Sequence, residues 1–128
     1  MMDVQDVIQI HHILIDKFGG SHGVRDLGAL EAAIHRPFAT FDKQELYPTV
    51  EEKAAAIFES ILINHPFIDG NKRTAYVMLR LILMDHGFDI HADQDEKYNM
   101  VMSVIRGEMR FEGIKDWIVS RISKRKVL

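Results

Sequence analysis

Apolar residues recur at helical spacing along most of the chain. In the first segment they stand three and four positions apart, which predicts one amphipathic helix over residues 4–18. Its inward-facing positions are Val4, Val7, Ile8, His11, Leu14, Ile15 and Phe18. Gly19 and Gly20 then end this helix. Asp26 is placed to cap a short second helix that runs through His35.

The central part of the chain predicts two longer helices joined by a short loop. Thr49 and Glu52 have the spacing of a capping box, which opens the first of them. We expect this helix to end near residue 64, because Pro66 disfavours helical geometry in the residue before it. The next helix is predicted over 71–85. Since its apolar residues lie on nearly all of its faces, we expect it to be a buried central helix.

Two further helices complete the predicted fold. Asp93 and Glu96 resemble another capping box and begin a helix that reaches Gly107, and a last helix is expected over 113–123. Residues 36–48 are predicted to form a long connection, a type of segment that is often functional. Since we find no sustained strand pattern, the sequence predicts an all-α fold, a compact helical bundle in a single domain over 1–128.

Composition narrows the functional classes. Of the 128 residues, 47% are hydrophobic and 27% charged, as in soluble globular proteins. The lack of cysteine excludes disulfides and thiolate chemistry, and the net charge of −3 argues against nucleic-acid binding through a basic face. We find no signal-peptide pattern, and the most apolar run is too short to span a bilayer. We therefore expect a cytoplasmic protein without membrane or direct nucleic-acid contacts.

The residues suited to chemistry gather in one stretch, 65–74, where the 71–85 helix begins. A helix start offers unpaired N–H groups and the positive end of the helix dipole, and Lys72 and Arg73 add two cations there. Together these groups predict an anion site, most naturally for phosphate. His65, at the other end of the stretch, is the residue type best suited to proton transfer near neutral pH. Phosphoryl or nucleotidyl transfer to a hydroxyl requires such a base facing a phosphate cradle.

Each of these residues also has a structural interpretation. His65 can interact with carbonyls at a helix end, and Asp69 can form a turn or cap a helix as well as hold Mg²⁺. Gly70 and Asn71 suit a tight turn whose amides form an anion nest. We expect Phe67 to anchor the stretch in the core rather than take part in chemistry.

The same stretch has a spaced pattern, His65-x-Phe67-x-Asp69-x-Asn71-Lys72-Arg73. This pattern resembles the signature loop of the Fic/Doc superfamily, and its lysine matches the Doc (death-on-curing) branch. Residues 18–26 and 31–37 resemble the Doc-type N-terminal region, so the similarity covers about residues 3–90. Such proteins are helical bundles with the motif between two central helices and typically a short β-hairpin flap. The resemblance implies a flap at 41–47, closed by Pro48.

The resemblance implies a Doc-like toxin, a protein kinase that transfers the γ-phosphate of ATP to a hydroxyl of a translation factor. The implied target is a threonine of elongation factor Tu. The expected catalytic residues are His65 as the base, Asp69, which holds Mg²⁺ or orients the target site, and Arg73. The residues expected to bind the nucleotide phosphates are Gly70, Asn71, Lys72 and Arg73.

Two positions distinguish this chain from AMP-transferring Fic proteins. These usually have glycine where this chain has Lys72, and a second arginine where it has Tyr76. Lysine fills and recharges the phosphate pocket, and Doc-type proteins, which share it, are associated with a reversed nucleotide pose that presents the γ-phosphate. Transfer of AMP from ATP is therefore the alternative function. A catalytically inactive helical module that binds phosphate or a peptide is the second alternative.

Many Fic proteins carry an inhibitory helix with the pattern Ser/Thr-x-x-x-Glu-Gly/Asn. Here Glu112 and Gly113 match its end, but Glu108 stands where Ser or Thr belongs. Restraint is therefore expected from another chain, as in the Doc pattern of a toxin held by a partly disordered, Phd-like antitoxin. For Gly19–Asp26 the sequence itself predicts only a turn and a helix cap, with Arg25 and Asp26 as a local pair.

Overall fold

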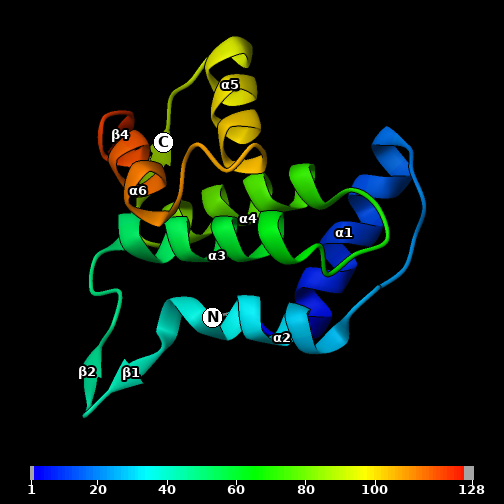
Figure 1. The fold of residues 1–128 in the computed structure, drawn as a ribbon, viewed down its shortest axis with the longest axis horizontal. Coiled ribbons are helices and arrows are strands. Elements are labelled where there is room, and N and C mark those ends of the chain that lie inside the picture. Colours follow the sequence, from blue (N-terminus) through cyan, green and yellow to red (C-terminus); the bar gives the residue numbers. More distant parts are fainter. Residues whose placement is uncertain (1, 126–128) are drawn as a thin grey trace.

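The computed structural model describes residues 2–125, and the ends of the expected domain, residue 1 and residues 126–128, lie outside this part. The described chain forms six α-helices and two small antiparallel sheets (Figure 1). The helices are α1 (Val4–Phe18), α2 (Leu27–His35), α3 (Val50–Asn64), α4 (Asn71–Asp85), α5 (Gln94–Ile105) and α6 (Phe111–Val119). The predicted all-α class is therefore confirmed.

The pair α3 and α4 forms the centre of the molecule (Figure 1). Ten consecutive residues of α3, from Lys53 to Leu62, are buried, because this helix contacts α2, α4, α5 and α6. The alanines at 54, 55 and 56 have no exposed surface, so neighbouring helices approach the backbone of α3 closely. In α4 the buried residues are Thr74, Ala75, Met78, Leu79, Ile82 and Leu83. The short loop between the two helices, together with the first turn of α4, contains the residues that the sequence predicts to carry the chemistry.

Helix starts follow the capping residues of the sequence. Thr49 and Glu52 form the predicted capping box, in which each backbone N–H donates to the other side chain over 3.2 Å. Asp26 caps α2 as expected. Asp93 caps α5, but the expected return bond is not formed, because the Glu96 carboxylate instead accepts a hydrogen bond from Arg121.

The second sheet was not predicted. Strands β3 (Phe88–Ile90) and β4 (Ile122–Lys124) pair antiparallel, with Ile90 opposite Ile122. The last helix runs over Phe111–Val119. The expected helix over 113–123 is wrong at both ends, because α6 begins two residues earlier and Ile122 and Ser123 belong to β4. Strands of three residues are too short to show the alternation by which a strand is recognised in sequence.

The connection between α2 and α3 carries a hairpin where the flap was expected. After a short 3₁₀ helix (Arg36–Phe38), strands β1 (Thr40–Phe41) and β2 (Gln44–Glu45) pair around Asp42 and Lys43. Both turn residues have positive φ, 52° and 65°, as a two-residue type I′ turn requires. The hairpin projects from the body of the molecule (Figure 1). Phe41 in its first strand is 76% exposed.

Arg36 anchors the base of this hairpin to α3. Its guanidinium donates to Oε1 of Glu59 over 2.8 Å and to the hydroxyl of Tyr47 over 3.0 Å. Burial lowers the pKa of Arg36, but the hydrogen bonds to Tyr47 and Glu59 outweigh this effect, so its pKa lies above the ordinary value. The base of the hairpin is thus held to α3 by the Arg36–Glu59 ion pair, and Lys53 of α3 adds a second ion pair, of 3.1 Å, to Glu45 in β2.

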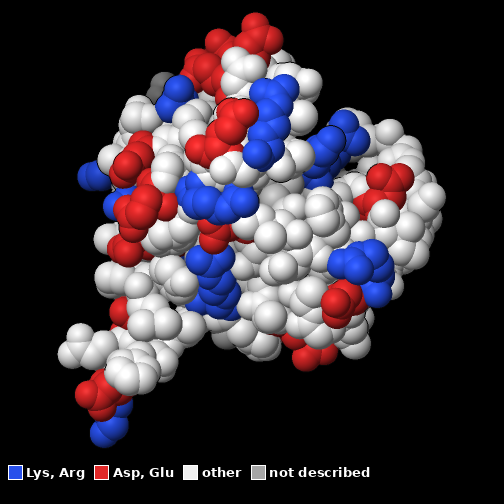
Figure 2. Space-filling model, viewed as in Figure 1, with Lys and Arg blue, Asp and Glu red and all other residues white. Residues whose placement is uncertain are grey.

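Charges of both signs are interspersed over the face shown in Figure 2. Within the described residues, no helix has the length and apolarity needed to cross a membrane.

Replacement of Glu59 by glutamine tests the anchor of the flap. The variant leaves the charge of Arg36 half-buried without its partner, and we expect the free energy of unfolding to fall by roughly 2 kcal/mol. Urea unfolding followed by circular dichroism measures this change. Glu112→Gln is the matched control, because Glu112 pairs with Lys115 at an exposed site and its replacement is expected to have no resolvable effect. Equal losses of unfolding free energy in the two variants would contradict the role of Glu59 as the buried partner of Arg36.

Candidate active site

The candidate site is the loop between α3 and α4, and it begins at an unusual backbone conformation. His65 is the C-cap of α3 and lies in the left-handed region, with φ 47° and ψ 62°. This conformation costs a non-glycine residue about 1–2 kcal/mol, so other contacts must hold it. Pro66 follows directly and prevents the helix from continuing through His65. The His65 side chain is exposed at this turn.

Arg25 closes the end of α3. Its Nε donates to the carbonyl of His65 over 2.6 Å, and its Nη2 donates to the carbonyl of Asn64 over 2.5 Å. Carbonyls at a helix C-terminus lack helical partners and carry the negative end of the dipole, so a guanidinium is well matched to them. Arg25 thus contacts the backbone of the candidate base and not Asp26, with which the sequence suggested a local pair.

The Gly19–Asp26 segment runs beside the motif loop and bonds to its backbone. The N–H of Ile68 donates to the carbonyl of Gly23 over 3.0 Å. The carbonyl of Pro66 accepts from the N–H groups of Arg25 and Asp26, over 2.8 and 3.1 Å. These bonds flank an isolated antiparallel bridge between Val24 and Phe67. The segment that the sequence marked only as a family feature is therefore the backbone support of the motif.

Helix α1 supports the loop from the other side. The imidazole of His11 stacks on the ring of Phe67, with centroids 3.9 Å apart and planes inclined by 3°. Its Nε2 lies 2.8 Å from the backbone carbonyl of Asp69. Because a carbonyl can only accept, this nitrogen carries the proton. His11 and Phe67 are both buried, so this stacked pair packs the motif loop against α1.

The side chain of Asn71 is engaged within the loop. Its Oδ1 accepts from the N–H of Phe67 over 3.0 Å, and its Nδ2 donates to the carbonyl of the same residue over 2.9 Å. Both hydrogen-bonding ends of the amide are thus used to shape the turn. Any contact of Asn71 with a phosphate would in this conformation come from its backbone N–H.

The carboxylate of Asp69 is held by two backbone amides. Oδ1 accepts from the N–H of Gly70 over 2.9 Å, and Oδ2 accepts from the N–H of Ser21 over 3.1 Å. The chain can approach this closely because residue 20 is glycine, where an added Cβ would lie 2.8 Å from Oδ2 of Asp69. The Asp69 side chain stays exposed, with lone pairs left for a further ligand.

The glycine at position 70 is needed for packing as well as for the turn. Its φ is +74°, and an added Cβ would lie 2.9 Å from the Ile15 side chain and 3.4 Å from that of His11. Gly70 is therefore fitted against α1. Since its N–H already donates to Asp69, the amides that lie open to an anion begin one residue further on, at Asn71.

Helix α4 begins without a side-chain cap, unlike α1, α2, α3 and α5. Its first turn carries Lys72 and Arg73, both exposed. Within residues 2–125, neither cation lies within ion-pair distance of a carboxylate, and Arg73 stacks 4.0 Å above the ring of Phe18 instead. Open N–H groups and two uncompensated cations at one helix start form a suitable anion site.

The side chain at position 76, where AMP-transferring Fic proteins usually have arginine, packs between α3 and α5. The ring of Tyr76 packs edge-on against Phe58 of α3, and Nζ of Lys97 on α5 lies 5.3 Å from its centroid. Burial raises the pKa of Tyr76 to about 12. A neutral phenol in this packed position provides no second charge for a phosphate.

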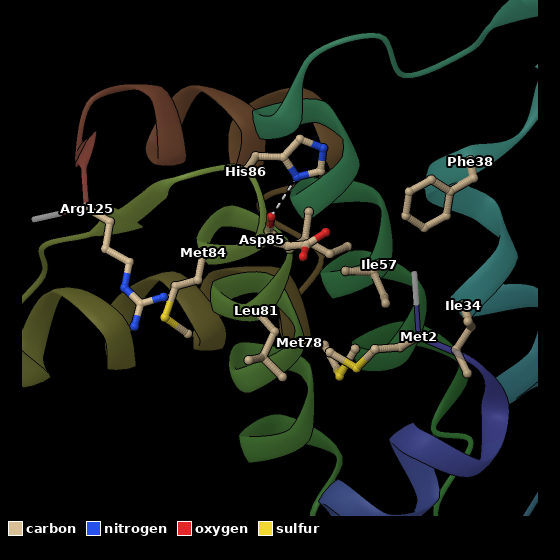
Figure 3. A pocket seen from close by; sticks show the side chains of 11 residues that line it. Met2, Ile34, Phe38, Ile57, Met78, Leu81, Met84, Asp85, His86 and Arg125 are labelled. Carbon is tan, nitrogen blue, oxygen red and sulfur yellow. Dashed lines mark hydrogen bonds between the residues drawn. The ribbon is translucent and has the colours of Figure 1, made fainter. Parts of the chain in front are cut away.

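The motif borders a small hollow and lies away from a larger cavity. A hollow of about 160 Å³ is lined by His65, Arg110 and apolar residues of α3 and α5. A cavity of about 550 Å³ lies around the other end of α4, where Met2, Ile34 and Met78 face it (Figure 3). This cavity contains none of the residues of the motif, so its size does not make it the candidate site.

Sequence comparison relates the chain to known proteins. The profile of the Fic/DOC family matches residues 1–83, which include both the motif loop and the Gly19–Asp26 segment. The chain is 42% identical over 94 residues to Toxin Doc of Mycolicibacterium smegmatis, which covers 73% of this chain and 70% of that protein. It is 29% identical over 112 residues to Protein kinase doc of Escherichia phage P1, which covers 88% and 87%.

Replacing Gly20 by alanine tests the support of Asp69. Alanine at Gly20 or at Gly19 meets positive φ, 117° or 91°, and each change is expected to cost roughly 1–3 kcal/mol. An added Cβ at Gly20 collides with the Asp69 carboxylate, whereas one at Gly19 meets nothing within 4 Å. We expect hydrogen exchange of the Ser21 amide to accelerate in Gly20→Ala beyond its rate in Gly19→Ala, the matched control. Equal rates in the two variants would show that the contact does not hold the loop.

Proposed function

This chain belongs to the Fic/DOC family, and from its site geometry we propose that it is a Doc-type toxin with protein kinase activity. The proposed reaction transfers the γ-phosphate of ATP to a threonine hydroxyl of a translation factor such as elongation factor Tu. Phosphorylation of that factor would halt translation in the cytoplasm. The names of the two relatives, a toxin and a protein kinase, support this proposal.

One observation carries the proposal. A short, well-held loop places a histidine at one end and the uncapped, doubly cationic start of α4 at the other, with the Asp69 carboxylate between them. The imidazole of His65 has no hydrogen-bond partner among residues 2–125, which leaves it available to a hydroxyl group. Simple phosphate binding would require neither the histidine nor the carboxylate.

In the proposed reaction His65 removes the proton of the target hydroxyl. The hydroxyl oxygen forms a bond to the γ-phosphorus as the bond from this phosphorus to the bridging oxygen of ADP breaks, and ADP leaves with the electron pair. Lys72, Arg73 and the first amides of α4 stabilise the negative charge on the phosphate oxygens. Positioning and charge stabilisation account for most of the catalysis in phosphoryl transfer, so this small set of groups is sufficient.

The residues present also fit a Mg²⁺ ion bound with the nucleotide. Mg²⁺ takes one or two carboxylates and completes its octahedron with phosphates and water. Asp69 is exposed, and each of its oxygens receives only one backbone N–H, so the carboxylate can still bind a metal. When bound, the ion would neutralise charge on the phosphates of ATP.

Position 72 favours the kinase over the AMP transferase. The lysine occupies the first turn of α4, where the positive end of the helix dipole disfavours a cation. A bound anion would offset this repulsion. Resemblance to Doc links this lysine to a nucleotide pose that presents the γ-phosphate. Tyr76, packed against Phe58, supplies no second arginine-like clamp for the pose of the AMP transferases.

Parallel assays with γ-labelled and α-labelled ATP, Mg²⁺ and elongation factor Tu test the reaction. We expect label from the γ position only, and a loss of roughly 10²–10⁴-fold in rate in His65→Ala, the usual effect of removing a general base. His35→Ala is the matched control, since His35 is exposed at the end of α2 and is expected to leave the rate unchanged.

Two other outcomes would contradict the proposed kinase reaction. Label from the α position would establish the AMP transferase. If neither label is transferred while ATP still binds, the chain is a binding module or acts on another target.

The proposed partner is an antitoxin of the Phd type, supplied by a separate chain. The chain lacks the inhibitory Fic pattern, since Glu108 replaces the required Ser or Thr. We therefore expect expression of the chain alone to arrest bacterial growth, and co-expression of the antitoxin to restore it. The growth curve of cells expressing His65→Ala at the same soluble level is the control, and this variant is expected not to arrest growth. Normal growth at high soluble expression of the wild type would contradict a toxin.

A further inference from the structure

Three exposed side chains converge beside the candidate site without belonging to it. His12 and Asp16 stand one turn apart on α1, and His22 reaches them from the Gly19–Asp26 segment. Nε2 of His22 lies 2.8 Å from Oδ1 of Asp16, and Nε2 of His12 lies 3.2 Å from Oδ2 of the same carboxylate. Each oxygen of one carboxylate therefore faces a different imidazole.

The arrangement has the dimensions of a metal site. The three potential ligand atoms lie within 4.8 Å of one another, and the two imidazole rings lie 4.3 Å apart with planes inclined by 32°. Zinc binds imidazole nitrogen and carboxylate oxygen at about 2.0–2.2 Å, so tetrahedral ligand atoms stand about 3.3 Å apart. The observed separations, 2.8 Å from His22 to Oδ1 and 3.2 Å from His12 to Oδ2, are shorter than this value and run to different oxygens of Asp16. Metal binding would therefore replace the His22–Asp16 hydrogen bond, and rotation of the three exposed side chains would bring both nitrogens and one oxygen around a single ion.

The donor atoms select the class of metal. Two imidazoles and one carboxylate suit zinc and similar transition-metal dications, whereas Mg²⁺ and Ca²⁺ prefer oxygen ligands alone. All three side chains are exposed, so a fourth position would be open to water. Exposure also means that the ligands can adjust without disturbing the core.

We propose that His12, Asp16 and His22 bind one divalent transition-metal ion, and that this ion fastens the Gly19–Asp26 segment to α1. His12 and His22 are each next in sequence to a residue that holds Asp69. Ser21, next to His22, donates a hydrogen bond to the Asp69 carboxylate, and His11, next to His12, donates one to the Asp69 carbonyl. A bound ion would therefore restrict the two elements that position Asp69. The proposal stands independently of the phosphotransfer reaction, since it uses none of the residues assigned to that reaction.

Calorimetric titration of the metal-free chain with Zn²⁺ tests the site, with any polyhistidine tag removed beforehand. We expect one Zn²⁺ per chain in the wild type, and affinity lower by at least about tenfold in Asp16→Asn and in His22→Ala. Loss of a mere outer-shell partner commonly has an effect of that size, and these residues are direct ligands. His35→Ala, which removes an exposed histidine outside the cluster, is expected to bind as the wild type does. No saturable Zn²⁺ binding, or binding unchanged in both cluster variants, would overturn the proposal.

Thermal unfolding and hydrogen exchange test the fastening. Zn²⁺ is expected to raise the Tm of the wild type but not of His22→Ala, whereas the same concentrations of Mg²⁺ or Ca²⁺ leave both unchanged. The amide of Ser21 is expected to exchange more slowly in the wild type when Zn²⁺ is present. If exchange of this amide is the same with saturating Zn²⁺ as without it, the ion does not fasten the segment, and that part of the proposal is wrong.

Discussion

The candidate site depends on the pairing of two loops, residues 19–26 and residues 65–70. Alone, the second loop would be unfavourable, because His65 adopts a left-handed conformation that costs about 1–2 kcal/mol. The first loop offsets this cost with main-chain bonds to Pro66 and Ile68 and with the two charge-assisted bonds of Arg25. At about 1 kcal/mol for an ordinary hydrogen bond and more for a charged donor, these contacts exceed the strain. The glycines of the first loop are what allow its backbone to come so close.

This pairing leaves the backbone of the loop rigid and its reactive side chains open. The carbonyls of Asn64, His65 and Pro66 are bonded, whereas the imidazole of His65 faces solvent. The same division appears at α4, where Asn71 uses its amide to hold Phe67 while the first N–H groups of the helix lie open. Groups that must act on a substrate need fixed positions but unoccupied bonding capacity, and the loop provides both. Its supporting contacts come from α1 and from the Gly19–Asp26 segment, so the site is an assembly of parts distant in sequence.

Sequence reasoning succeeded where the information was local. Helical periodicity and capping residues located the helices, as Thr49 and Asp26 show, and the cations at the start of α4 drew attention to the motif. It failed where two distant segments determine each other. Strands β3 and β4 are too short to show a pattern alone, and Ile90 becomes a strand residue only because it faces Ile122. For the same reason no local feature of Ser21 indicated a bond to a carboxylate 48 positions away. The available signal was the glycines of this segment, Gly20 and Gly23, which indicate a close approach of two chain segments but not which segment the partner is.

The histidines show why residue type alone does not identify a catalytic group. His11, on α1, contacts the loop that begins at His65, and it has the same side-chain chemistry. It is only 3% exposed, however, and its Nε2–H donates to the carbonyl of Asp69. It cannot accept a proton from a substrate at that nitrogen without breaking the bond that positions Asp69. His65 is exposed, and its contacts with Arg25 involve its backbone, so its ring remains available. Of the two, the histidine without a side-chain partner is the one suited to act as a base, whereas the buried one holds the backbone of Asp69 in the same loop.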